Sequence, residues 1–350
     1  MQNPNQCPRV VIYGLGQMGL VCAQLLSAAT QSGGPRAEVV GWGHDPMEIA
    51  RLAQTRRSDR LPEFLLPESI RIALRPEDAF AGADLVLCAV PVQFIREAFM
   101  GVAHLVPRRA GVVSVAKGIE NETLLRPTQI LSDCLGDDPD APGRRYAALS
   151  GPTIASELAR CLPATMIAAS DDDGFACDIQ RLFSTSWLRV YTNDDLPGVE
   201  LSGAMKNVVA IAAGILDGLQ AGYNAKSALL ARGLAEIARL GGAMGAQDRT
   251  FAGIAGVGDL ATSCFSPEGR NRSCGEALGR GILLEDYLRS TRHVVEGVAT
   301  TRSVVDLARK YRVEVPIAEA VHAVLFDGLD PIEGISRLMS RELRSERSGK

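Results

Sequence analysis

The stretch from Val199 to Leu219, VELSGAMKNVVAIAAGILDGL, constrains the fold most strongly. Read as a helix, it is apolar or small on almost every side, and such a helix is stable only when other elements bury it. Lys206 lies near its middle, with small or aliphatic neighbours at helical spacing. Because an unpaired buried ammonium is costly, Lys206 must find a distant partner, open onto a polar cavity or extend its stem to reach solvent.

Length and charge exclude several classes of protein. The chain has 350 residues, of which 46% are hydrophobic and 22% charged, which predicts two domains or one large one. The net charge is −4, and the only basic cluster is a short Arg-rich tail after Ser340, which argues against a nucleic-acid partner. No uninterrupted apolar run reaches the roughly 18 residues of a membrane span. We therefore expect no membrane span.

The cysteines and the N-terminus indicate a cellular compartment. The eight cysteines are scattered without a C-x-x-C pair, which fits free thiols in a reducing cytoplasm and gives no reason to expect a metal. The first eight residues carry no charged region and no apolar region of a signal peptide. We expect a cytoplasmic protein.

A glycine motif follows the first apolar run. Residues 9–13 read as a short buried strand, Gly14-Leu15-Gly16-Gln17-Met18-Gly19 comes next, and a helical pattern follows. Strand, G-x-G-x-x-G and helix in this order bind dinucleotides. Gly14 allows the tight turn, Gly16 lets the backbone approach a pyrophosphate, and Gly19 lets helix pack on strand. The alternative is a glycine-rich turn without a ligand.

The end of the second predicted strand, 38–42, bears on the choice of cofactor. An acidic residue there binds ribose hydroxyls and a basic one accepts a 2′-phosphate. Here His44 precedes Asp45, so the signal is split and the choice between NAD and NADP stays open. Arg51, Arg56 and Arg57 could assist a 2′-phosphate, or they form a solvated helix face.

Two domains follow from the distribution of patterns. Strands are predicted at 9–13, 38–42, 70–74, 84–90, 111–116, 146–150, 163–169 and 187–192, whereas helical periodicity dominates after Thr192. The sequence predicts an α/β Rossmann-type doubly wound sheet in residues 1–192 and an all-α domain in residues 193–341. Residues 342–350 are predicted to be a frayed tail.

Polar residues follow two of the later strands, where parallel sheets collect their ligands. Lys117 comes directly after the strand 111–116, and Gly151 and Thr153 follow the strand 146–150. Thr153 is predicted to cap the next helix, beside backbone amides that suit an anion. Position alone leaves Lys117 equally compatible with a ligand site and with a solvated loop.

The second half contains two further candidates. Gly253 to Gly258 form a glycine-rich turn that delivers Asp259, which could orient a lysine or a substrate hydroxyl, or cap the helix that starts at Leu260. Arg270 and Asn271 stand beside a predicted helix start and suit a phosphate dianion. A solvated arginine pair is the alternative.

Together these motifs resemble the soluble bacterial type of NAD(P)-dependent glycerol-3-phosphate dehydrogenase, from about Val10 to Arg341. The most specific pieces are VELSGAMKNVVAIAAGI, GIAGVGDL, the RNR triplet and VVEGVATT, and LSGPT and VAKGIE add to them. The resemblance implies reduction of dihydroxyacetone phosphate by NAD(P)H to sn-glycerol 3-phosphate, which feeds phospholipid synthesis. It also implies a homodimer.

The resemblance also assigns residues to roles. Lys206 is similar to the catalytic proton donor and acceptor, and Lys117 to a group that supports it. The implied substrate contacts are Lys117, Gly151, Thr153, Lys206, Asp259, Arg270 and Asn271. The implied cofactor contacts, together with the glycine motif and its Gln17 and Met18, are His44, Lys117, Ala155, Arg270, Val294 and Glu296.

Four departures from the family pattern involve five residues. Gln17-Met18 stand where Ser-Trp is usual, Arg60 replaces an aromatic residue, Gln93 replaces His, and Gly269 replaces Ser. The first two departures are expected near the nicotinamide side and Gly269 near the substrate phosphate. A related dehydrogenase acting on another small phosphorylated or carboxylated ketone is therefore the alternative. A non-catalytic nucleotide-binding regulator would not need both lysines.

Overall fold

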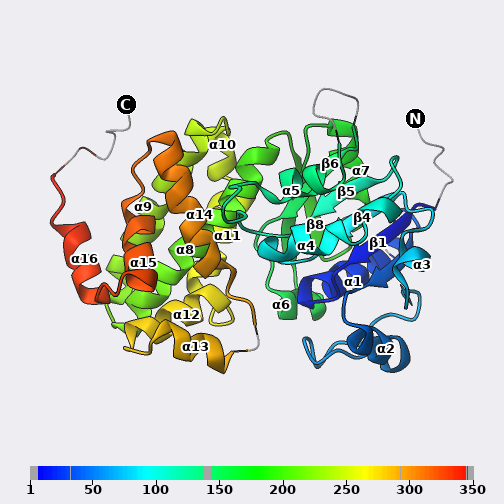
Figure 1. Cartoon of the computed structure of the whole chain (residues 1–350), viewed down its shortest axis with the longest axis horizontal. Helices are drawn as coiled ribbons and strands as arrows, with labels where there is room; N and C mark the ends of the chain where they lie inside the picture. Colours follow the sequence, from blue (N-terminus) through cyan, green and yellow to red (C-terminus); the bar gives the residue numbers. More distant parts are fainter. Residues whose placement is uncertain (1–6, 32, 138–142, 292, 344, 346–350) are drawn as a thin grey trace. The chain divides into compact units, whose positions relative to one another are not determined.

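The computed structural model describes residues 7–31, 33–137, 143–291, 293–343 and 345. The chain forms two compact units (Figure 1). The first unit takes in the chain up to Ala116 and then Pro127–Leu196. The second takes in Lys117–Arg126 and the chain from Pro197 onward.

The first unit is built on one sheet. In the described residues its strands are β1 (Arg9–Tyr13), β2 (Glu38–Trp42), β3 (Arg71–Ile72), β4 (Leu85–Cys88), β5 (Gly111–Ser114), β6 (Tyr146–Ser150), β7 (Ala164–Ala169) and β8 (Leu188–Asn193). Their order is β3-β2-β1-β4-β5-β6-β7-β8. The inner strands are almost fully buried because apolar runs such as LVLC in β4 face helices on both sides.

The pairing is parallel except between β6 and β7. The strand order reverses at β1, which is the switch point of a doubly wound sheet. The predicted fold class is therefore confirmed. The antiparallel step was not predicted; the connection between β6 and β7 contains a five-residue helix.

Helices cover the sheet in two layers. Helix α1 packs with α6 and α7, and α4 packs with α5. The helices of this unit are α1 (Gln17–Gln31), α2 (Pro46–Thr55), α3 (Pro76–Phe80), η1 (Val92–Phe94), α4 (Ile95–Met100), η2 (Ala103–Leu105), α5 (Pro127–Cys134), α6 (Ala155–Ala159) and α7 (Asp173–Phe183). Asp172 caps α7 by accepting a hydrogen bond from the amide of Phe175 at 2.8 Å.

The second unit is helical. Its elements are α8 (Leu196–Gly218), α9 (Gly222–Ala243), α10 (Asp248–Phe251), η3 (Ile254–Gly258), α11 (Asp259–Phe265), α12 (Arg270–Gly279), α13 (Leu284–Ser290), α14 (Glu296–Tyr311), α15 (Pro316–Phe326) and α16 (Pro331–Met339). Helix α8 is long and apolar enough to cross a membrane, but 89% of its apolar window is buried inside the protein. It is the core helix that the sequence predicted.

The segment Lys117–Arg126 differs from the predicted domain division, which placed it in the first domain. Ile119 is fully buried in the core of the helical unit, and its carbonyl accepts a hydrogen bond from Ser303 Oγ at 3.0 Å. Arg126 forms a buried ion pair with Glu200 of α8. Most of the predicted tail 342–350 lies outside the described residues.

Candidate active site

Two lysines of the helical unit share one buried carboxylate. Lys117 Nζ donates to Asp259 Oδ2 at 2.6 Å, and Lys206 Nζ donates to Asp259 Oδ1. Asp259 is 1% exposed and the Lys206 side chain 8% exposed. Lys206 has therefore found the distant partner that its buried position required, and the carboxylate offsets part of the cost of burying the two ammonium groups.

The local sequence explains how Asp259 reaches both lysines. The turn before it packs closely, since a Cβ on Gly256 would lie 1.9 Å from the carbonyl oxygen of Phe251. Gly258 occupies the cap position of α11, and Asp259 is the first helical residue. The Asp259 carboxylate bonds to the two lysines. Of the two predicted roles, the structure therefore supports orienting a lysine and not capping the helix.

The cluster shifts the proton affinity of Lys206. The pKa of Lys206 is lowered to about 8: burial is the main cause, the charge of Lys117 contributes, and the Asp259 carboxylate opposes both effects. An amine in this range can both hold and release a proton near neutral pH, as general acid–base chemistry requires.

Two neighbours of the cluster were not predicted from the sequence. Ser263 Oγ lies 2.7 Å from Lys206 Nζ, and the Asn207 amide donates to the carbonyl oxygen of Lys117 at 3.4 Å. Ser263 is four residues after Asp259 on the same helix, so helical spacing could have identified it. Asn207 offered no signal beyond its position next to Lys206.

The RNR triplet places an amide and a guanidinium at the start of α12. Asn271 Oδ1 accepts a hydrogen bond from the amide of Gly297 at 2.9 Å, which leaves the Nδ2 group to donate elsewhere. Arg270 is exposed, and its Nη1 donates to the carbonyl oxygen of Val294 at 3.2 Å. Burial raises the pKa of Glu296, whereas the positive charges of Arg270, Lys117 and Lys206 lower it, so this carboxyl group is electrostatically coupled to the cluster.

In the first unit, the glycine motif fits a dinucleotide. Gly14 has a φ of +103°, and a Cβ there would lie 2.8 Å from the carbonyl oxygen of Ala89. A Cβ on Gly19 would lie 1.8 Å from the carbonyl oxygen of Gly14, so helix and strand need both glycines. A Cβ on Gly16 would meet no atom within 4 Å, which leaves bare backbone beside open space for a pyrophosphate.

The other predicted cofactor residues of this unit surround that loop. Gln17 Nε2 donates to the carbonyl oxygen of Arg60 at 2.8 Å, so two of the four departures are in direct contact. Met18 packs partly buried against the core. His44 is exposed beyond the end of β2, and Ala155 is the first residue of α6.

Gly151 and Thr153 follow β6 as predicted, but the capping role of Thr153 was wrong. Ile154 occupies the cap position of α6, and the Thr153 hydroxyl donates to the carbonyl oxygen of Gly151 at 3.1 Å. Gly151 has a positive φ of +131°, and the turn there brings its carbonyl oxygen within reach of the Thr153 hydroxyl. The hydroxyl therefore bonds to this carbonyl and does not cap α6. Both residues belong to the first unit, whereas Lys117, Lys206 and Asp259 belong to the second.

Comparison with known families decides the assignment. The family model described as the NAD-dependent glycerol-3-phosphate dehydrogenase N-terminus matches residues 9–176, and the model for the C-terminus of the same enzyme matches residues 195–336. The chain belongs to this family. The resemblance predicted from the sequence motifs is confirmed, and the family uses NAD(P) as its cofactor.

Individual glycerol-3-phosphate dehydrogenases cover nearly the whole chain. An NAD(P)+ enzyme of Salinibacter ruber is 44% identical over 341 residues, covering 96% of each protein. One of Mycobacterium leprae is 43% identical over 346 residues, covering 96% of this chain and 97% of the relative. The crystal structure of glycerol-3-phosphate dehydrogenase from Coxiella burnetii superposes with a TM-score of 0.88 at 31% identity, covering 96% and 99% of the two chains.

The remaining departures from the family pattern have ordinary surroundings. Gln93 lies in η1, directly after β4. Gly269 caps α12 without any side-chain hydrogen bond, and a Cβ there would lie 3.2 Å from the carbonyl oxygen of Ser263. A serine at this position would therefore need a small shift of its neighbours.

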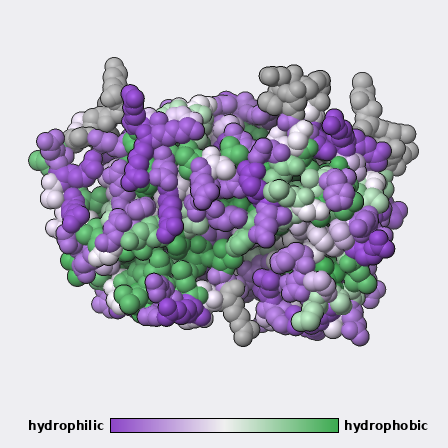
Figure 2. Space-filling model, in the orientation of Figure 1, coloured by the Kyte–Doolittle hydropathy of each residue, from purple (hydrophilic) through white to green (hydrophobic). Residues whose placement is uncertain are grey.

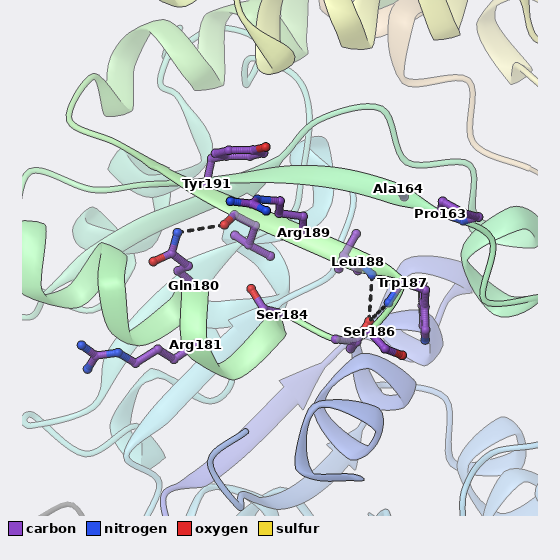
Figure 3. A pocket seen from close by; sticks show the side chains of 12 residues that line it. Pro163, Ala164, Gln180, Arg181, Ser184, Ser186, Trp187, Leu188, Arg189 and Tyr191 are labelled. Carbon is purple, nitrogen blue, oxygen red and sulfur yellow. Dashed lines mark hydrogen bonds between the residues drawn. The ribbon is translucent and has the colours of Figure 1, made fainter. Parts of the chain in front are cut away.

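The described residues contain no group of three or more His, Cys, Asp or Glu side chains that could hold a metal. A cavity of about 670 Å³ lies at the exposed edge of β8, lined by residues such as Trp187 and Arg189 (Figure 3). The carbonyl oxygen of Val190 on that edge already accepts a hydrogen bond from Gln180, so the edge is protected against pairing.

Proposed function

We propose that this protein reduces dihydroxyacetone phosphate with NAD(P)H to sn-glycerol 3-phosphate, reversibly, and so feeds glycerophospholipid synthesis. Membership of the glycerol-3-phosphate dehydrogenase family supports the reaction. The observation that carries the assignment is the pair of lysines on Asp259, because ketone reduction needs a proton donor beside the carbonyl oxygen.

Lys206 is the proposed general acid. When bound, the reduced nicotinamide supplies the hydride. As the ketone is reduced, its oxygen gains negative charge, and the Lys206 ammonium stabilises that charge and donates its proton. The lowered pKa of Lys206 makes this proton available, and Asp259 and Ser263 hold the ammonium in place. Lys117 adds positive charge to the same carboxylate and supports the developing alkoxide.

Arg270 and Asn271 are the proposed phosphate contacts. The Asn271 amide is oriented by its hydrogen bond to Gly297, so its Nδ2 group is available to a phosphate oxygen. The backbone amides at the start of α12 and the Arg270 guanidinium add further hydrogen-bond donors, which carry partial or full positive charge and so suit a phosphate. Gly151, Thr153 and Ala155 are proposed contacts from the first unit, and Val294 and Glu296 are proposed cofactor contacts.

The test is the loss of NADPH absorbance, and separately of NADH absorbance, when dihydroxyacetone phosphate is added to purified protein. Rapid oxidation of at least one cofactor is expected. Measurable cofactor binding without oxidation of either would contradict the substrate assignment and favour another small phosphorylated or carboxylated ketone.

We also propose a homodimer in the cytoplasm. All eight cysteines are free thiols, which supports a reducing compartment. Apolar side chains are exposed around α13, including Leu283 at 70% and Ile282 at 45%, and apolar surface gathers over this part of the helical unit (Figure 2). Exposed apolar patches of this kind favour association. Light scattering after size exclusion should give twice the chain mass of 37.3 kDa.

A further inference from the structure

The end of β2 lies directly beside the glycine loop. The amide of Gly14 donates to the carbonyl oxygen of Trp42 at 2.9 Å, and Gln17 bonds to the backbone of Arg60. In doubly wound folds, the residues beyond this strand receive the adenine ribose and distinguish a 2′-hydroxyl from a 2′-phosphate. The family pattern led us to expect Arg60, which replaces the usual aromatic residue, near the nicotinamide side. Its guanidinium instead contacts Glu48 in the helix that follows β2, where it can affect the choice between NAD and NADP.

Arg60 is already occupied by a carboxylate. Its Nε donates to Glu48 Oε1 at 2.7 Å, and its Nη2 donates to Glu48 Oε2 at 3.1 Å. Arginine also binds phosphate by such two-pronged geometry, so Glu48 occupies one edge of the guanidinium and competes with a phosphate for it. The negative charge of Asp45 is close enough to stabilise the Arg60 cation as well.

Two of the other three arginines that follow this strand are also engaged, whereas Arg57 is exposed. Arg51 pairs with Asp59 at 2.6 Å, and Arg56 donates through Nη2 to the carbonyl oxygen of Ile70 at 2.8 Å. Asp45 Oδ1 caps α2 by accepting from the amides of Met47 and Glu48. Arg51 and Arg60 are thus each paired with a carboxylate, which lowers their attraction for a phosphate dianion.

From this geometry we propose that Glu48 is a specificity-determining residue: by holding Arg60 it makes the protein prefer NADH to NADPH. A 2′-phosphate on Arg60 would compete with Glu48 for the guanidinium and would face its carboxylate at close range. An unphosphorylated ribose has no such conflict. This inference takes from the proposed function only that the cofactor is NAD(P). It does not depend on the substrate, because the ribose contacts do not involve the ketone.

Binding of two adenosine fragments tests the proposal without catalysis. Adenosine 2′,5′-bisphosphate and 5′-AMP differ only in the 2′-phosphate, and calorimetry on the full-length protein gives both dissociation constants. The wild type is expected to bind 5′-AMP more tightly. Glu48→Gln should strengthen binding of the bisphosphate on the order of tenfold, because Arg60 then becomes available, and should leave 5′-AMP nearly unchanged.

The matched control is Glu63→Gln, which removes the same charge from the exposed turn after Arg60 and leaves the Arg60–Glu48 and Arg51–Asp59 pairs intact; it should not reproduce the gain. The double variant Glu48→Gln/Arg60→Gln should lose the gain. Arg60→Gln alone, which tests the same pair if Glu48→Gln does not fold, should weaken the bisphosphate because Glu48 is left without its counterion.

Three results would overturn the proposal: tighter wild-type binding of the bisphosphate than of 5′-AMP, an unchanged preference in Glu48→Gln, or a gain that survives in the double variant. Failure of the enzyme to reduce dihydroxyacetone phosphate would contradict the proposed function and leave these fragment affinities untouched. The two hypotheses can therefore fail separately.

Discussion

At the scale of single residues, the unusual feature is one carboxylate that serves two ammonium groups. Asp259 uses both oxygens, one for Lys117 and one for Lys206, and is itself almost fully buried. The net charge of the three groups is therefore positive, which suits a substrate that carries a phosphate and develops an alkoxide. The arrangement also couples the proton affinity of one lysine to the presence of the other.

Removal of the proposed general acid should abolish most of the turnover. Lys206→Ala is expected to lower kcat by about 10² to 10⁴-fold, the usual effect of removing a positioned proton donor. Cofactor affinity and the circular dichroism spectrum should stay near the wild-type values. Lys310→Ala is the control, because Lys310 is an exposed lysine of α14. A variant at position 206 with near-normal rates would refute the role given to Lys206.

The pH profile should report the coupling between the lysines. The pKa of Lys206 is lowered to about 8 by burial and by Lys117, so reduction should slow as the pH rises through this range and the ammonium deprotonates. Lys117→Met removes the repelling charge and should move this alkaline limb to higher pH, besides lowering the rate. The measurement is kcat/KM for dihydroxyacetone phosphate against pH. A limb that stays in place, or moves to lower pH, would contradict the coupling.

At the scale of elements, α8 and α12 pack backbone against backbone. Gly214 and Gly218 of α8 face Gly275 and Gly279 of α12, and a Cβ on Gly275 would lie 1.9 Å from the carbonyl oxygen of Ile211. Helix α8 carries Lys206, and α12 begins with Arg270 and Asn271. The close contact therefore fixes the proposed phosphate contacts relative to the proposed acid.

A methyl group in this contact should be costly. Gly275→Ala is expected to lower the free energy of unfolding by about 1 to 3 kcal/mol, because α12 must move away from α8, and to raise KM for dihydroxyacetone phosphate. The control is Gly242→Ala in α9, where the added Cβ meets only Asp248 Oδ1 at 3.9 Å; it should stabilise by about 1 kcal/mol through helix propensity. Urea unfolding measures both, and equal effects would contradict the packing argument.

A buried carboxyl group links α9 to α15. Glu236 accepts hydrogen bonds from the amides of Ile317 at 2.8 Å and Ala318 at 3.3 Å, at the start of α15. Burial nevertheless raises the pKa of Glu236 from 4.5 to about 7, with a further contribution from Glu319 and an opposing one from Arg239. Between these two pH values the folded state holds a proton that the unfolded chain has lost.

The free energy of unfolding should therefore fall as the pH rises from about 4.5 to 7, and Glu236→Gln should flatten this dependence. Urea unfolding at a series of pH values across the interval measures it. Glu333→Gln on α16, an exposed partner of Arg337, is the control and should keep the wild-type slope. A wild-type stability that rises over this interval would refute the assignment.

At the scale of the whole molecule, the sequence predicted the architecture correctly but assigned the segment Lys117–Arg126 to the wrong unit. Apolar runs bounded by Gly and Pro located all the strands of the sheet, and the buried Lys206 signalled a polar partner. Local patterns carry that information. The antiparallel pairing of β7, the bond between Gln17 and Arg60, and the approach of Ser263 to Lys206 depend on tertiary contacts that no local pattern encodes.

Lys117 shows the same limit most clearly. It follows β5 directly in sequence, which led to its prediction in the first domain, yet the segment from Lys117 to Arg126 packs with the helical unit. Ile119 is buried there, and Arg126 pairs with Glu200, whose side chain is 1% exposed. The chain thus leaves the first unit, delivers one proposed active-site lysine to the second, and returns at Pro127.

Because this segment packs with the helical unit, replacement of Arg126 should lower the stability of that unit and not of the sheet. Arg126→Met leaves Glu200 without its buried counterion and should destabilise the helical unit by about 3 to 5 kcal/mol. Hydrogen exchange should then quicken in α8 and α14, while β1 and β4 keep their protection, although Arg126 directly precedes α5 of the first unit in sequence. Replacing both partners, Arg126→Met with Glu200→Met, removes both charges and should restore most of the protection, because buried pairs exchange for apolar residues at little cost. Faster exchange in β1 and β4 instead would place the segment with the sheet.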